Sequence, residues 1–325
     1  MVRLAIGLVA LTVVLLGTQN VRADEAIWRN HMATAAEAVK RGDHTAAAQM
    51  YNAALRQAEA FNAGDLQLAA TYFGLGQAQR ALHDYPPAEK HFLRALSMLE
   101  TVNGAMHERN TGVLHGLADL YRVQGRYAEA ESYYKRELAI IEKTQGPHHP
   151  AVAQALSNNL AALYRVQMRR EEVEGLYRRA LAILEKALPA NDPQVGLALI
   201  DLAEWYQGLQ RYADAEPYYR RGIPIIEKTF PPAHPRVLLL LNDWGVVRQL
   251  QGRYTEAESV FKMMLAIIEK AQGPRHPNVG IALNNLVGVY EVQGRHAEAD
   301  AARKRMLEIG NTPFRGQPYV PHQGR

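Results

Sequence analysis

Tyrosine recurs along this chain with a period of 42 or 43 residues, and this period constrains the fold more than any other feature of the sequence. The tyrosines that mark it are Tyr121, Tyr164, Tyr206 and Tyr290, with Arg248 in the skipped position. A chain with such a period builds its core from stacked copies of one unit, each of which buries its apolar face against its neighbours. The sequence therefore predicts an array of similar units.

Each unit is predicted to be a hairpin of two antiparallel helices. The first helix begins at a proline, which is tolerated there because the first amide group of a helix has no partner in any case. Leu114, Leu117 and Tyr121 follow at helical spacing and predict one buried stripe. The 287 residues from 24 to 310 have room for about seven such hairpins. The prolines in question are Pro150, Pro193, Pro235 and Pro277, preceded by His149, Asp192, His234 and His276.

The pattern resembles a known repeat family. The run Leu114-x2-Leu117-Ala118-x2-Tyr121, followed by Ala130-x3-Tyr134, is similar to the tetratricopeptide repeat, which usually has 34 residues. The longer period, the His-Pro pairs and the runs NNLAALYRVQ at 158–167 and RALAILEK at 179–186 look more like the 42-residue repeats of kinesin light chains. The resemblance implies an all-α fold: a right-handed α-solenoid of about seven antiparallel helix hairpins, with a concave surface that binds peptides or proteins. The coiled coil that joins kinesin light chains to a motor has no counterpart here, so motor and cargo roles are not carried over.

Residues 1–23 have the three-part composition of a secretory signal peptide. Arg3 supplies an early positive charge, an apolar run extends from Leu4 to Leu16, and Val21-Arg22-Ala23 offers a cleavage site after Ala23. The alternative is a retained membrane anchor, which needs about 20 apolar residues and so exceeds this run. We therefore expect cleavage after Ala23, no integral membrane span in the mature chain, and a periplasmic or secreted location in a bacterium.

The expected domain organisation has three parts. Residues 1–23 form the signal peptide and residues 24–310 form the repeat domain. Residues 311–325 contain Pro313, Pro318 and Pro321 and continue no period, which is typical of a disordered tail.

Several kinds of chemistry are disfavoured by composition. The chain has no cysteine, and no two of its 12 histidines stand four residues apart, so we expect no metal and no cofactor. The net charge is only +4 and most tyrosines occupy repeat positions, which disfavours binding to nucleic acid. No glycine-rich phosphate loop or GxSxG motif is present, and the repeats leave no room for a separate catalytic domain of about 100 residues. We expect a protein that is not an enzyme.

A second stripe on the first helices is the candidate binding groove. It lies beside the buried stripe, at helical spacing, and is rich in asparagine, a poor residue for helix interiors. We expect its amides to bind the main chain of a peptide or protein partner and its charged residues to select that partner. The alternative is that the asparagines only brace neighbouring repeats, in a structural spacer or oligomerisation scaffold of the cell envelope without a discrete ligand. The predicted groove residues are His115, Asp119, Arg122, Asn158, Asn159, Arg165, Asp201, Glu204, Asn242, Asp243, Asn284 and Asn285.

Overall fold

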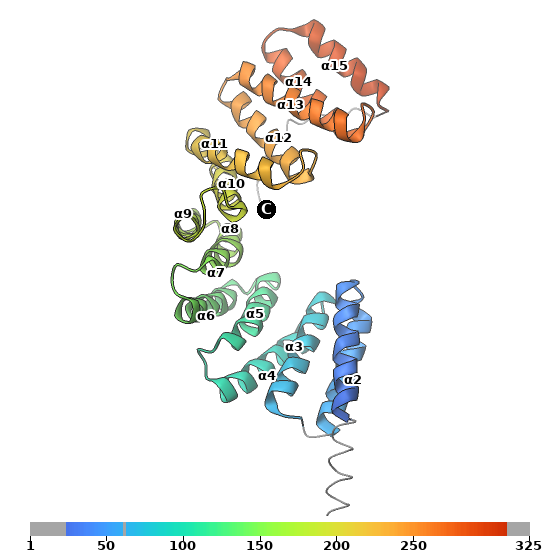
Figure 1. Ribbon diagram of the computed structural model, residues 1–325, viewed down its shortest axis with the longest axis vertical. Coiled ribbons are helices and arrows are strands. Elements are labelled where there is room, and N and C mark those ends of the chain that lie inside the picture. The colour runs from blue at the N-terminus through green and yellow to red at the C-terminus, as the bar shows by residue number, and fades with distance from the viewer. Residues whose placement is uncertain (1–23, 61–62, 311–325) are drawn as a thin grey trace, which may run out of the picture. The chain divides into compact units, whose positions relative to one another are not determined.

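The computed structural model describes residues 24–60 and 63–310, and all regular secondary structure within them is helical (Figure 1). The expected signal peptide and tail lie outside the described residues. The chain divides into two compact units, Met1–Ala155 and Leu156–Arg325.

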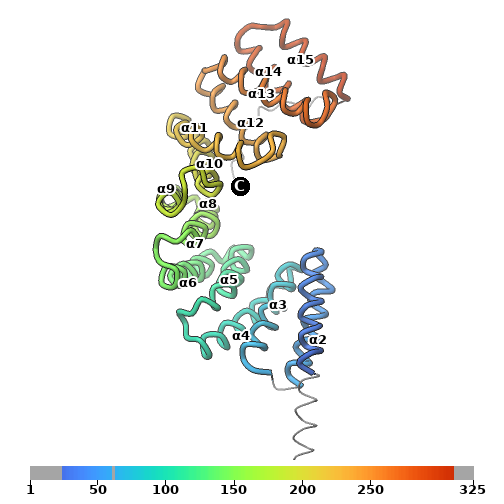
Figure 2. The backbone as a smooth tube through the Cα atoms, in the orientation of Figure 1, coloured from blue at the N-terminus to red at the C-terminus, as the bar shows by residue number. Residues whose placement is uncertain are grey.

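Unit 1 consists of helical hairpins (Figure 2). The helix over residues 24–40 precedes α2, and α3 and α4 pack against each other, as do α5 and α6. The bounds are α2 (His44–Ala60), α3 (Asp65–Ala81), α4 (Tyr85–Asn103), the short 3-10 helix η1 (Glu108–Asn110), α5 (Thr111–Val123), α6 (Tyr127–Gln145) and α7 (Pro150–Gln154).

Unit 2 continues the same arrangement. The boundary between the units falls within η2, a π-helical segment between α7 and α8. In this unit α8 packs against α9, α10 against α11, α12 against α13, and α14 against α15. The bounds are η2 (Ala155–Ala161), α8 (Ala162–Val166), α9 (Arg170–Ala187), α10 (Pro193–Gly208), α11 (Tyr212–Thr229), α12 (Pro235–Leu250), α13 (Tyr254–Gln272), α14 (Pro277–Val292) and α15 (His296–Glu308).

The residue before each repeat proline caps the helix that follows. The Nδ1 atoms of His149, His234 and His276 each accept a hydrogen bond, at 3.2 Å, from the backbone N–H two residues later. Asp192 accepts the equivalent bond through Oδ1 at 2.8 Å. These bonds satisfy amide groups that have no partner inside the helix. Helix capping therefore explains the recurrence of these histidines.

An arginine in the turn after each of several first helices ties its hairpin to the hairpin before it. Arg211 donates to Glu174, 37 residues earlier, at 2.9 Å, and also to Asp214 at 2.7 Å. Its guanidinium lies 4.7 Å from the centre of the Tyr206 ring, and the Tyr206 hydroxyl donates to the same Glu174. We call this arrangement the arginine staple. The other pairs at the same separation of 37 residues are Arg126 with Glu89, Arg253 with Glu216, and Arg295 with Glu258.

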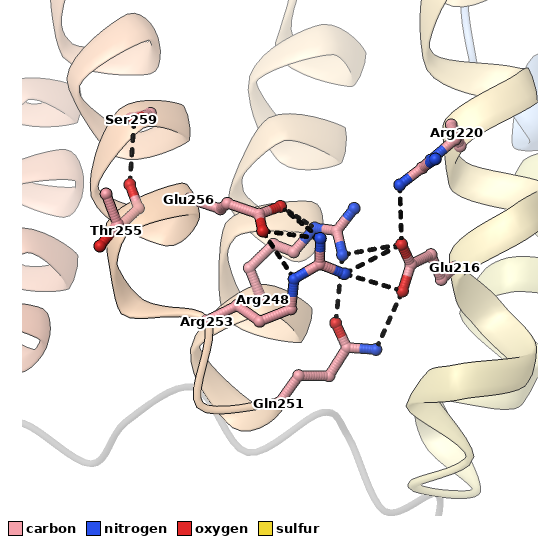
Figure 3. A network of polar contacts seen from close by, with 8 residues as sticks. All are labelled: Glu216, Arg220, Arg248, Gln251, Arg253, Thr255, Glu256 and Ser259. Atoms are coloured by element: carbon pink, nitrogen blue, oxygen red, sulfur yellow. Dashed lines mark hydrogen bonds and ion pairs between the residues drawn. The ribbon is translucent and has the colours of Figure 1, made fainter.

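Arg248 enlarges one of these staples (Figure 3). It replaces the tyrosine of the other hairpins and is only 3% exposed. Its guanidinium lies 3.8 Å from the centre of the Trp244 ring, and Nη1 is 2.9 Å from Glu216 Oε1. Arg253 contacts the same carboxylate at 3.0 Å. The buried cation is thus held by both a carboxylate and an aromatic ring.

Candidate partner-binding surface

The first helices of unit 2 present exposed apolar side chains that the core does not use. Leu239 and Leu250 are separated by three helical turns on α12 and are 52% and 51% exposed. Ile281 and Val292 hold the same positions on α14, 42 residues later, and are 51% and 59% exposed. These two helices are neighbours in unit 2. We call these four residues the apolar strip.

Three carboxylates lie beside the apolar strip. Glu204 of α10 occupies the repeat position that Val246 occupies in α12. Asp201 of α10 occupies the repeat position of Asp243. Desolvation by the surrounding protein and the charges of Asp243 and Asp201 raise the pKa of Glu204 to about 7, although its side chain keeps solvent contact. Burial raises the pKa of Asp243 to about 6 and also raises the pKa of Asp201. Ionisation of these three carboxylates is therefore opposed by their surroundings.

Two of these carboxylates have no direct polar partner within the part of the chain that the structure describes. Neither the Asp201 nor the Glu204 side chain forms a hydrogen bond or an ion pair there. Asp243, which is buried, accepts a long hydrogen bond of 3.3 Å from the Asn242 amide. Arg165 and Arg236 lower the pKa values of Asp201 and Glu204 only through longer-range attraction.

Unit 1 brings its predicted residues into a closed polar network. Asp119 accepts a hydrogen bond of 2.6 Å from the Tyr134 hydroxyl and forms ion pairs of 3.3 Å with both Arg80 and Arg122. His115 Nε2 lies 3.7 Å from the same carboxylate. Burial opposes ionisation, but this hydrogen bond and these positive charges together lower the pKa of Asp119. Asp119 is thus satisfied by its own unit.

Arg80, Tyr134 and a further member of that network, Glu137, were not among the predicted groove residues. Glu137 of α6 is buried and lies 3.3 Å from His115 Nδ1. This hydrogen bond is the main reason that the pKa of His115 is raised, although burial opposes it. Arg80, Glu137 and Tyr134 lie on helices other than that of His115, and no spacing in the sequence links them to it. Only the packing of the helices brings them together.

The predicted asparagines differ in their surroundings. Asn242 is buried, and its Oδ1 accepts a hydrogen bond of 2.6 Å from Asn285 Nδ2 on the next first helix. Asn158 is exposed, whereas Asn159 and Asn284 are half-buried. Arg165 is exposed, with Nη1 3.5 Å from the Tyr177 hydroxyl. The stripe thus contains at least one hydrogen bond between asparagine side chains of neighbouring repeats, together with accessible polar groups.

The described residues contain neither a metal-ligand cluster nor a helix suited to span a membrane. No group of three or more His, Asp or Glu side chains among them could hold a metal ion. None of the helices between residues 24 and 310 is both long and apolar enough to cross a membrane.

The hairpins and their exposed first-helix faces define a helical-repeat protein. The tetratricopeptide repeat profile matches residues 24–101, 111–158, 155–228 and 236–311. The chain therefore belongs to the tetratricopeptide repeat family. A comparison with curated proteins gave no match.

Solved structures with the same fold include repeat proteins of several kinds. A Podosopora anserina protein, described as a kinesin light chain with nearly identical repeats, is 24% identical over 65% of this chain and 99% of its own, with a TM-score of 0.55. BtubC from P. vanneervenii is 21% identical over 75% of this chain and 97% of its own, with a TM-score of 0.58. A signal-transduction ATPase of Pyrococcus horikoshii with a tetratricopeptide repeat sensor is 18% identical over 86% of this chain and 41% of its own, with a TM-score of 0.68. At these identities the likeness concerns the fold.

Proposed function

We propose that this protein is exported and acts without catalysis, as a scaffold that binds a peptide or protein partner through the exposed faces of its first helices. The apolar strip is the observation that carries the proposal. Leu239, Leu250, Ile281 and Val292 are all at least half exposed, although each helix already has a buried stripe that forms the core. Exposed apolar side chains that gather on adjacent elements mark interaction sites.

Two sequence features support the rest of the proposal. The composition of residues 1–23 supports export to the periplasm or beyond the cell. The tetratricopeptide repeats occupy nearly all of residues 24–311, which supports a binding role over a catalytic one.

A structural spacer is the second candidate, and one contact favours it. The hydrogen bond from Asn285 to Asn242 joins neighbouring repeats, as bracing asparagines would. Such a bond contributes about 1 kcal/mol net to stability and requires no partner.

Replacing Asn158 and Asn284 together by alanine separates the two candidates, with Asn242→Ala as the separate variant that removes the bracing bond to Asn285. Partner capture from an envelope extract, followed by titration of the captured partner, measures binding, and thermal melting measures stability. A binding groove predicts at least about a tenfold loss of affinity with little change in melting, since several neutral hydrogen bonds of about 1 kcal/mol each are lost. Unchanged affinity with a much lower melting temperature would instead support the spacer.

Leu239→Ser combined with Ile281→Ser tests the apolar strip directly. Both side chains are exposed, so the protein should fold normally but bind its partner at least about tenfold more weakly. Met263→Ser, at a 43% exposed position on α13, is the matched control. Equal affinity of the double variant and the control would exclude the strip as the binding surface.

A further inference from the structure

The first-helix face of unit 2 changes from apolar to acidic across three successive first helices. On α14 and α12 it carries the apolar strip. On α10 the position equivalent to Val246 is occupied by Glu204, next to Asp201. Asp243 of α12 lies close enough for its charge to raise the pKa of Glu204.

The positive charge near these carboxylates does not balance their negative charge. The charged groups that act on Asp201 and Glu204 are Arg165 of α8 and Arg236 and Asp243 of α12; Tyr177 of α9 also interacts electrostatically with both carboxylates, and α11, which packs on α10, supplies none of the described charged groups. Two guanidinium groups thus face three carboxylates. Since neither Asp201 nor Glu204 has a direct polar partner among the described residues, a further cation would gain direct contacts here.

We infer that unit 2 binds an extended peptide segment that places apolar side chains on the apolar strip and a lysine or arginine against Asp201, Glu204 and Asp243. This inference rests on the proposed function and specifies the chemistry of the partner. The charge of the face favours a basic residue at one end of the segment, and the exposed aliphatic groups favour apolar residues at the other.

The spacing of the helices sets the spacing of the ligand. Packed helices lie about 8–10 Å apart, and an extended chain advances about 3.3 Å per residue. Since α14 and α12 pack together, a segment that crosses from one to the other needs about three residues. The expected pattern is two apolar residues about three residues apart, followed by one basic residue that reaches the carboxylates of α10.

Within the described part of unit 1, Asp119 does not offer a comparable site. This carboxylate is already paired with Arg80 and Arg122 and bonded to Tyr134. A ligand cation at Asp119 would have to compete with these groups. The preference for a basic residue is therefore assigned to unit 2.

A peptide library tests the chemistry without knowledge of the natural partner. The purified protein is immobilised, a library of random 12-residue peptides is passed over it, and the bound pool is sequenced. We expect enrichment of lysine or arginine a few residues from an apolar residue, with depletion of aspartate and glutamate. A bound pool that is enriched in acidic residues, or that is apolar without a basic residue, overturns the inference.

Paired variants test the contact itself. The best library peptide is compared with a copy in which norleucine replaces its basic residue. Glu204→Gln with Asp243→Asn should weaken the basic peptide at least about tenfold and the norleucine peptide less than about twofold, because only the basic peptide loses a charged contact. Glu204→Gln alone removes an exposed group and should show the same selectivity if the double variant is unstable. Glu59→Gln, an exposed glutamate of α2, is the control. Equal losses for both peptides overturn the inference.

The pH dependence provides a third readout. A carboxylate must be ionised to attract the ligand cation, and the pKa values of Glu204 and Asp243 are about 7 and about 6. Affinity for the basic peptide should therefore rise from about pH 5 to about pH 8, with little change for the norleucine peptide. If both peptides bind independently of pH, the carboxylates do not contact the ligand.

Different experimental outcomes would contradict this inference and the proposed function. If library peptides bind and Leu239→Ser weakens them, but Glu204→Gln does not, the inference is wrong and the proposed function stands. If no peptide binds and a captured protein partner is also indifferent to Leu239→Ser with Ile281→Ser, both are wrong.

Discussion

Arg248 shows how a single residue changes the joint between two hairpins. In neighbouring hairpins a tyrosine stands in its place, and the Tyr206 hydroxyl donates to Glu174 of the hairpin before. Arg248 contacts the equivalent carboxylate, Glu216, with a charged group and stacks on Trp244. Charge-assisted hydrogen bonds are stronger than neutral ones, but a buried guanidinium has a desolvation cost. The net contribution of Arg248 to the free energy of unfolding therefore depends on all of its partners being present.

Replacing Arg248 by alanine should lower the free energy of unfolding by about 2 kcal/mol. The variant loses the stacking on Trp244 and one of the cations at Glu216, although Arg253 still pairs with that carboxylate. Arg220→Ala is the matched control, because Arg220 contacts the same Glu216 but its side chain is 67% exposed. The control should lose less than about 0.5 kcal/mol. Urea unfolding measures both, and equal losses would contradict a special role for the buried arginine.

Residue positions in the core were more predictable than residue partners. The predicted stripe of Leu114, Leu117 and Tyr121 is buried, because a 3.6-residue period alone determines which side of a helix faces its neighbour. The bonds of Asp119 to Arg80 and Tyr134 depend on three different helices, and no local spacing encodes them. The sequence was therefore enough to predict the fold, but not the polar networks within the candidate surface.

At the scale of the helix pair, glycine sets how closely two helices approach. On α12, a Cβ added to Gly245 would lie 2.3 Å from the Phe261 ring of α13. The ring can therefore pack directly on the backbone of α12. Gly175 of α9 has no such neighbour within 4 Å.

Gly245→Ala and Gly175→Ala should consequently change stability in opposite directions. The first forces the Phe261 ring to move and should cost about 2 kcal/mol. The second removes backbone freedom from the unfolded chain at an open helical position and should gain about 0.5–1 kcal/mol. Differential scanning calorimetry of both variants against the parent protein measures the difference. A stabilised Gly245→Ala protein would show that α12 and α13 can separate without loss.

At the scale of the molecule, each hairpin depends on its neighbours for burial. Deleting residues 277–325 removes α14 and α15 and uncovers the surface of α13 that packs against α14. We expect this truncated protein to aggregate or to melt at a lower temperature, because stability in a repeat array rises with the number of interfaces. A chain that ends at Gly310 keeps both helices and is the control. A monomeric and equally stable truncation would contradict the dependence on neighbours.

Export is a separate prediction for the whole chain. Cleavage after Ala23 would give a mature protein that begins at Asp24. The intact mass of the protein recovered from the periplasm or the medium measures this start. Recovery from the membrane of a species that retains Met1 would instead indicate an anchor.

The arginine staple bears on how a gene that encodes such repeats can gain or lose a repeat. Arg211, Arg253 and Arg295 each reach a carboxylate 37 residues earlier, so the hairpins of Arg211 and Arg253 each supply a donor to the hairpin before and an acceptor to the hairpin after. A tandem duplication of one whole period of 42 residues copies both halves of the joint together. The inserted hairpin would have an ion-pair partner on each side without any further mutation. Unequal recombination can therefore lengthen or shorten the array in whole periods while the ionic joints between hairpins are kept.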